Sequence, residues 1–233
     1  MNYIIYGYMR SGTTMLTTML NSHPNLKCYA EESADVLPTL NENEGINIKY
    51  PHLAPGEITS LADSYKIIHL VRTNVFQTAI SNYINDNKAQ TKTPTAHIFS
   101  KNENLYYITK QDKHDRQIPK ANRQSHKNIE TDKIIVDYNY VKDAMYRIHN
   151  NINKQIEYLN GHPNVLTLTY EDLTSNGNDI TTLDSDISTQ LCDFLGVTRY
   201  DMYCTTMKVN DNRYEKYIAN WEELQSLREL IEE

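Results

Sequence analysis

The sequence predicts a three-layer α/β fold of the P-loop-like kind, with a central, mostly parallel sheet between helices. An apolar run over residues 3–7 ends in glycine and leads into apolar residues at helical spacing. A second buried run over residues 66–72 leads into another helix, and VLTLTY at residues 165–170 follows a long amphipathic pattern. Strands that alternate with helices in this way are typical of parallel sheets.

The helices follow in order along the chain. The first has apolar residues at 15, 16, 19 and 20 and stops at His23-Pro24, and the second shows Val75, Ala79 and Tyr83 on one face. A long helix is predicted from apolar residues that step by three and four, namely Val141, Met145, Ile148, Ile152, Ile156 and Leu159. One helix ending near residues 194–196 and a final helix over 221–231 complete the predicted fold.

Composition favours a single domain over residues 1–233, because 39% hydrophobic and 23% charged residues are ordinary for a globular protein of this length. Residues 82–132 are polar and aperiodic, so we predict an irregular lid insertion there.

The net charge of −7 argues against nucleic-acid and membrane partners. No leader or membrane span is visible, which predicts a soluble cytoplasmic protein. The three cysteines lack the spacing of a disulfide framework or a zinc site.

A phosphate-binding loop is predicted between the first strand and the first helix. Gly7, Gly12 and Thr14 satisfy the P-loop spacing, but Thr13 stands where a nucleoside triphosphatase has lysine. What remains is a turn of backbone N–H groups over residues 11–14, a helix N-terminus and Arg10, which suit a group less charged than a γ-phosphate. The alternative is a tight turn in which Ser11 and Thr13 only cap the helix.

Several collinear segments resemble sulfotransferases that use 3′-phosphoadenosine 5′-phosphosulfate. RSGTTML at residues 10–16, followed by NSHPN at 21–25, resembles the family's 5′-phosphosulfate loop. Arg72 and Ser81 match its 3′-phosphate clamp, R-x-N-x-x-x-x-x-x-S. Three later segments match further blocks of the family, namely YEDL at 170–173, FLG at 194–196 and ANWEEL at 219–224. The resemblance leaves the middle insertion uncovered.

Two further segments narrow the resemblance to the bacterial carbohydrate and tyrosylprotein sulfotransferases. CYAEE at residues 28–32 is similar to their C-G-E-E and C-x-G-E motifs, with Ala30 in the glycine place, and NIKYP at 47–51 is similar to a lysine segment. The resemblance implies that Glu31 is the general base and that Lys49 stabilises the leaving oxygen. Glu32 and His52 stay open as alternative bases, whereas His69 lies within an apolar strand and is predicted to be a core residue.

The same resemblance assigns the binding residues. Arg10 and the loop residues Ser11, Gly12, Thr13 and Thr14 are predicted to hold the 5′-phosphate, and Arg72 with Ser81 the 3′-phosphate. Tyr170 is predicted either to contact adenine or to be a core aromatic. Lys208 and Arg213 lie where the family closes a basic loop over the 3′-phosphate, although its glycine-rich form is absent. We expect Glu171 and Asp172 to cap a turn and Trp221 to be packing.

The predicted function is therefore transfer of a sulfuryl group from 3′-phosphoadenosine 5′-phosphosulfate to a hydroxyl of a small-molecule or glycan acceptor such as a carbohydrate, without a metal. The acceptor is expected to bind the insertion at residues 82–132. Two alternatives stay open. One is a kinase using Mg-ATP, which would need an acidic residue at the end of a strand, and Asp137 is the best candidate for it. The other is a non-catalytic nucleotide-binding protein. The sequence does not reveal the oligomeric state.

Overall fold

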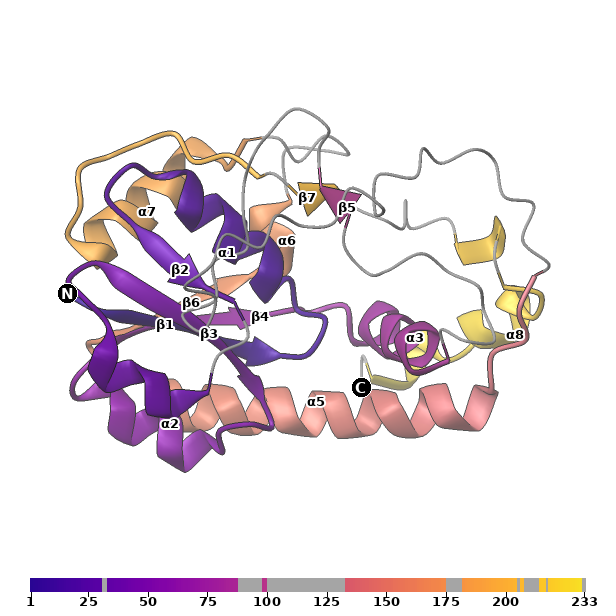
Figure 1. The fold of residues 1–233 in the computed structure, drawn as a ribbon. Helices are drawn as coiled ribbons and strands as arrows, with labels where there is room; N and C mark the ends of the chain where they lie inside the picture. The colour runs from indigo at the N-terminus through magenta and orange to yellow at the C-terminus, as the bar shows by residue number, and fades with distance from the viewer. Residues whose placement is uncertain are drawn as a thin grey trace.

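A five-stranded sheet forms the centre of the protein (Figure 1). The computed structural model describes residues 1–30, 33–87, 98–99, 133–174, 182–204, 206–207, 214–216 and 218–231. The strand order is β2-β3-β1-β4-β6, and every neighbouring pair is parallel. The structure thus confirms the predicted α/β class and its parallel sheet.

The central strand carries the phosphate loop. β1 (Tyr3–Tyr8) lies between β3 (Glu44–Tyr50) and β4 (Lys66–Val71), and β2 (Lys27–Tyr29) and β6 (Val165–Thr169) are the outer strands. Gly7 is in register with Lys49 on one side and Leu70 on the other. The carboxyl ends of three strands therefore meet where the loop begins, which is where open α/β sheets bind ligands.

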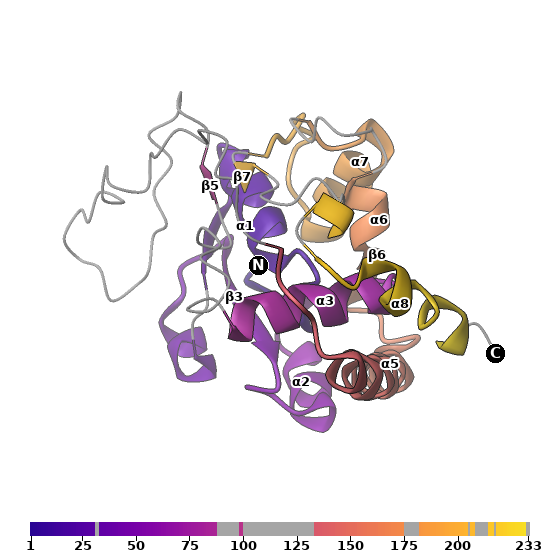
Figure 2. The same cartoon turned by 90° about the vertical axis from the view of Figure 1, so that its right-hand side faces the viewer.

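Helices cover both faces of the sheet, as Figures 1 and 2 show. On one face lie α1 (Thr13–Ser22), α6 (Tyr170–Leu173) and α7 (Ser185–Leu195). On the other face lie α2 (Pro55–Ala62) and the carboxyl-terminal part of α5 (Tyr138–Leu159). α3 (Val75–Asp86) packs on α5 beyond the carboxyl ends of the strands (Figure 1).

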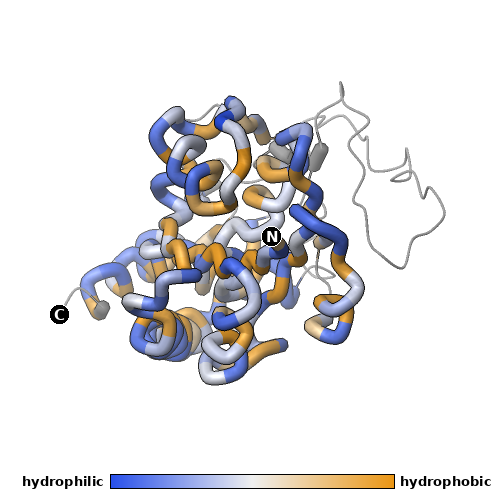
Figure 3. The backbone as a smooth tube through the Cα atoms, turned by 90° about the vertical axis from the view of Figure 1, so that its left-hand side faces the viewer, coloured by the Kyte–Doolittle hydropathy of each residue, from blue (hydrophilic) through white to orange (hydrophobic). Residues whose placement is uncertain are grey.

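Each strand sends alternate residues into the two layers. Tyr3 and Ile5 of β1 join the core beneath α1 and α7, whereas Ile4 and Tyr6 join the core above α2. In Figure 3, hydrophobic and hydrophilic residues alternate around the helices, as expected for helices with one buried face. The sheet is thus held from both sides, and its carboxyl edge is left for the site.

Most predicted elements are present, with shifted ends. The strands predicted over 3–7, 66–72 and 165–170 are β1, β4 and β6, and the long predicted helix is α5. α5 begins at Tyr138 because the side chain of Asp137 accepts a hydrogen bond from the Tyr140 amide and caps it. The final helix is not continuous, since α8 (Trp221–Gln225) is followed by a separate 3-10 turn, η4 (Arg228–Ile231).

Several short elements were not predicted. They are β2, β3 and α2, the 3-10 turns η1 (Ala34–Thr39) and η3 (Tyr214–Lys216), and an antiparallel pair formed by β5 (Ile98–Phe99) and β7 (Thr206–Met207). α3 continues to Asp86, five residues into the range predicted as an insertion. The rest of that range, apart from 87, 98 and 99, lies outside the described residues. No helix in the described ranges is both long and apolar enough to cross a membrane.

Candidate functional site

The loop between β1 and α1 turns sharply through two residues with positive φ. Arg10 has φ of 68° and Gly12 has φ of 93°. The Ser11 amide donates to the Tyr8 carbonyl at 3.1 Å, and the first helical bond runs from the Leu16 amide to the Gly12 carbonyl at 3.0 Å. The amides of Thr13 to Met15 therefore have no partner within the helix, so the loop presents N–H groups at the positive end of α1.

Side-chain capping does not explain the serine and threonines of this loop. Gly12 is the N-cap of α1, and no side chain caps that position. The Ser11 hydroxyl is buried and has no hydrogen-bond partner among the described residues. An orphaned buried hydroxyl beside a helix N-terminus is the arrangement expected where a ligand oxygen binds. The tight-turn alternative, which needs Ser11 or Thr13 as a cap, loses its support.

Arg72 and Ser81 lie next to the loop, as predicted. Arg72 follows β4 and is only 7% exposed. Its guanidinium donates to the Arg10 carbonyl at 3.2 Å and to Gln77 Oε1 at 2.9 Å, while Arg10 Nε donates to Ser81 Oγ at 3.0 Å. Arg10, Arg72 and Ser81 thus form one cluster, which we call the arginine cluster. The buried Arg72 Nε has no partner among the described residues.

Tyr170 closes the space between the arginine cluster and the loop. The Arg72 guanidinium lies over its ring, 4.6 Å from the centroid. On the loop side, a Cβ added to Gly12 would lie 2.5 Å from Tyr170 Cδ2, so only glycine permits this approach. Burial raises the pKa of Tyr170, and Arg72 opposes that rise. Tyr170 touches the core, and it is also a wall of the site.

Lys49 and the two histidines have different surroundings. Lys49 is half-buried at the end of β3, in register with Gly7 at the start of the loop. His52 is exposed, and its amide donates to the Lys49 carbonyl at 2.8 Å. His69 is fully buried between Gln155 and Thr167, and burial lowers its pKa to about 4. Its predicted place in the core is confirmed.

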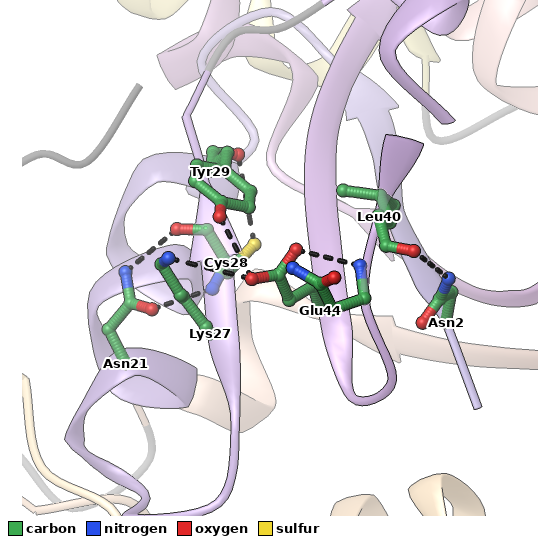
Figure 4. Close-up of polar contacts among 8 residues, drawn as sticks. Asn2, Asn21, Lys27, Cys28, Tyr29, Leu40 and Glu44 are labelled. Carbon is green, nitrogen blue, oxygen red and sulfur yellow. Dashed lines mark hydrogen bonds and ion pairs between the residues drawn. The ribbon is translucent and has the colours of Figure 1, made fainter. Parts of the chain in front are cut away.

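The strand that leads to the predicted base is held on both sides, as Figure 4 shows. The Asn21 side chain accepts from the Cys28 amide at 2.7 Å and donates to the Cys28 carbonyl at 2.9 Å. Glu44 accepts from the Tyr29 hydroxyl at 3.0 Å and forms an ion pair with Lys27 at 3.5 Å. These contacts fix β2, the edge strand that ends two residues before position 31. Glu31 and Glu32 themselves lie outside the described residues.

Glu44 and Cys28 show the electrostatic character of this strand. Burial raises the pKa of Glu44, but hydrogen bonds from Asn41 and Tyr29, together with the charge of Lys27, outweigh it and hold the pKa below its usual value. Burial raises the pKa of the Cys28 thiol to about 12. Glu44 is therefore a charged structural anchor, and Cys28 is an inert thiol.

Tyr214 is a site residue that the sequence did not reveal. The residue is 3% exposed, and burial raises its pKa while the charges of Arg72 and Arg10 oppose that rise. Its ring stacks on Trp221, with centroids 5.5 Å apart, which confirms the packing role predicted for Trp221. With 18 tyrosines in the chain, nothing marked this one except its place seven residues before Trp221.

Three acidic residues act as helix anchors. Glu171 accepts from the amides of Thr73 and Asn74, each at 3.2 Å, and Asp172 forms a capping box with Thr169. Asp137 caps α5 instead of ending a strand of the sheet, so the kinase alternative loses the acidic strand end on which it relied.

Two of the sequence predictions are not tested by these contacts. Lys208 and Arg213 lie outside the described residues. In the parts of the chain that the structure describes, no group of three or more His, Cys, Asp or Glu side chains is arranged to hold a metal ion. That no metal takes part in the reaction stays a prediction.

The loop and the arginine cluster together place backbone N–H groups and two guanidinium groups at the carboxyl edge of the sheet, an arrangement that suits a phosphorylated ligand. Residues 3–109 match the model of the sulfotransferase family. The match covers less than half of the chain, and it agrees with the resemblance predicted from the sequence.

Two solved structures are similar to the chain. One is mouse sulfotransferase SULT7A1 complexed with PAP, with 16% identity and a TM-score of 0.46 over 86% of this chain. The other is the sulfotransferase domain from the curacin biosynthetic pathway, with 16% identity and a TM-score of 0.43, covering 84% of this chain and 74% of that one. The chain spans 60% of the mouse protein. A search of curated proteins gives no match.

Proposed function

We propose that the protein transfers a sulfuryl group from 3′-phosphoadenosine 5′-phosphosulfate to a hydroxyl of a small-molecule or glycan acceptor, such as a carbohydrate. The observation that supports this most is the arginine cluster. Arg72 is a residue only 7% exposed, and no carboxylate among the described residues pairs with it. A buried cation without a counterion is costly. A bound phosphate supplies both the charge and the acceptor for its unpartnered Nε.

The two anionic groups of the donor have separate places in this proposal. Arg72 and Ser81 take the 3′-phosphate, and because Arg10 is the donor in its bond to Ser81, the serine keeps its own proton for a phosphate oxygen. The amides of residues 12–14 and the orphaned Ser11 hydroxyl take the 5′-phosphate. Tyr170, between the loop and Arg72, offers a ring edge or face to the adenosine.

The chain's own groups account for charge stabilisation and proton transfer. The bound donor supplies the sulfuryl group and departs as adenosine 3′,5′-bisphosphate. Arg10, the loop amides and Lys49 are positioned to stabilise the negative charge of the departing oxygen. Glu31, which follows the clamped β2 strand in sequence, accepts the proton of the acceptor hydroxyl and contributes about 10²–10⁴-fold. Residues 82–132 provide the acceptor contacts.

A thermal-shift comparison tests the choice of nucleotide. A ligand at 100 times its dissociation constant stabilises the folded state by about 2.7 kcal/mol. We expect adenosine 3′,5′-bisphosphate to raise the melting temperature clearly and Mg-ATP to raise it little, because position 13 lacks the lysine that a triphosphate needs. The reverse order would refute the sulfotransferase proposal and restore the kinase alternative.

A pair of variants tests the arginine cluster in the same assay. Arg72→Lys keeps the positive charge but loses the planar fork, so bisphosphate stabilisation should fall while the ligand-free melting temperature changes less. The matched control is Arg147→Lys, at an exposed position on α5, which should respond to bisphosphate like the wild type. Equal responses from both variants would remove Arg72 from the binding site.

A second pair of variants tests the base. Glu31→Gln should keep bisphosphate binding and lower sulfate transfer by about 10²-fold or more, since the amide does not accept a proton. Glu32→Gln, one residue further along, is the matched control and should retain most of the turnover. Turnover would be measured with labelled donor against a panel of sugars, peptides and lipids. If Glu31→Gln stays active and Glu32→Gln does not, the base is Glu32.

A further inference from the structure

Tyr214 is placed where its ring is fixed and its hydroxyl faces cations. The ring stacks on Trp221 at an interplanar angle of 28°, and Trp221 in turn lies 5.7 Å from the ring of Phe76 on α3. The residue is 3% exposed. Aromatic contacts of this kind hold the ring in one orientation, so the position of the hydroxyl is set by the fold.

The hydroxyl of Tyr214 lies beside both arginines of the site. The positive charges of Arg72 and Arg10 both lower its pKa. A guanidinium has donors only, so neither arginine accepts the proton of the tyrosine hydroxyl. Burial nevertheless raises the pKa of Tyr214 above its usual value, so the group stays protonated. Its O–H is therefore available to donate to an acceptor lying near the two arginines.

Arg72, beside the Tyr214 hydroxyl, has an unsatisfied hydrogen-bond donor. Arg72 directs its terminal nitrogens to the Arg10 carbonyl and to Gln77, and its buried Nε has no partner among the described residues. A phosphate monoester has enough acceptor oxygens to take bonds from Arg72, Ser81 and a tyrosine hydroxyl at the same time. Few other biological groups combine that number of acceptors with the charge that two arginines require.

We propose that Tyr214 is a ligand of the 3′-phosphate, donating its hydroxyl proton to the phosphate that Arg72 and Ser81 also hold. This assignment rests on the proposed function, because it needs a 3′-phosphorylated adenosine as the ligand. It makes Tyr214 a selectivity residue. The hydroxyl distinguishes nucleotides that carry the second phosphate from the far commoner nucleotides that lack it.

Tyr214→Phe tests the assignment, because it removes one oxygen and keeps the ring that stacks on Trp221. Binding of adenosine 3′,5′-bisphosphate, adenosine 5′-phosphate and adenosine 3′-phosphate would be measured by calorimetry. Hydrogen bonds to charged groups imply a loss of about tenfold or more for the two nucleotides with a 3′-phosphate. Affinity for adenosine 5′-phosphate should stay within about twofold of the wild type.

Tyr200→Phe is the matched control. Tyr200 packs edge-on against His23, at the opposite end of α1 from the phosphate loop, about 15 Å away along a ten-residue helix. All three affinities should be unchanged in this variant. The ligand-free melting temperature of Tyr214→Phe would show whether the fold has been kept.

The outcomes separate the two proposals. If the wild type does not prefer the bisphosphate to adenosine 5′-phosphate, the proposed function fails, and this assignment fails with it. If the wild type shows the preference and Tyr214→Phe keeps it, the proposed function stands and the tyrosine assignment is wrong. An equal loss for all three nucleotides would also overturn the assignment, because it would show that Tyr214 only supports the fold.

Discussion

Residue type alone does not distinguish the structural polar residues of this protein from those proposed to bind a ligand. His69 and Arg72 are three positions apart, and both are buried polar residues, one within β4 and the other directly after it. The ring nitrogens of His69 lie at 3.3 Å from Gln155 and 3.4 Å from Thr167, so its polar groups are used within the core. Arg72 keeps an unused donor. This unused donor supports the binding role proposed for Arg72.

His69 gives a prediction about acid stability. Between its folded pKa of about 4 and the ordinary 6.5, the unfolded chain binds the proton and the folded chain does not. The free energy of unfolding should therefore fall as the pH drops through this range, by roughly 3 kcal/mol from this residue. Urea unfolding between pH 7 and pH 4.5 measures this slope.

Substitution isolates the contribution of the histidine. His69→Gln should be less stable than the wild type at pH 7 but lose less stability on acidification. His52→Gln, at an exposed position, should keep the wild-type slope. A slope that is the same for all three proteins would show that His69 does not set the acid sensitivity.

At the scale of elements, β2 is the segment that leads to the proposed base. It is a strand of three residues, and in the part of the chain that the structure describes β3 is its one neighbour in the sheet. The Asn21 carboxamide makes both of the bonds that a missing neighbouring strand would make to Cys28 (Figure 4). Asn21 stands in α1, so this side chain ties the phosphate-loop helix to the strand that runs toward Glu31.

Asn21→Ala should therefore affect turnover more than nucleotide binding. Two lost hydrogen bonds predict a destabilisation of about 1–3 kcal/mol. With the strand released, kcat for sulfate transfer should fall by about tenfold or more, while the bisphosphate affinity stays within a few-fold of the wild type. Asn160→Ala, at an exposed position after α5, is the control for the loss of an asparagine. Equal losses in kcat and in affinity would contradict a role specific to β2.

The elements that the sequence predicted are those with an unbroken apolar pattern. β1, β4 and α5 could be identified because their buried residues are apolar and regularly spaced. β3 was missed because the polar or small residues Glu44, Gly45 and Asn47 are also buried, which breaks the alternation on which strand prediction depends. Gly45 is required there because the ring of Tyr3 lies against it. Such a contact between distant residues is not visible in one sequence.

For the whole molecule, the fold class and most residues of the candidate site could be predicted from the sequence. Arg10, Arg72, Ser81 and Tyr170 are brought together as expected, although they are up to 160 positions apart. These residues could be predicted because they stand at the spacing of motifs that resemble those of a known family. Tyr214 carried no such motif, and its role follows only from what the fold places beside it. Residues 82–132, to which we assign the acceptor contacts as a proposal, have no recognisable sequence pattern.

The contact between the Tyr170 ring and Gly12 has a consequence for how the protein matures. A chain emerges from the ribosome N-terminus first, so the loop that contains Gly12 emerges long before Tyr170, whose ring lies against it. At about 5–20 residues per second, the two are separated by roughly ten to thirty seconds of synthesis. A partly made chain therefore displays the loop without the Tyr170 ring beside it. Under the proposed function, the nucleotide site is complete only once translation has reached the C-terminal third of the chain.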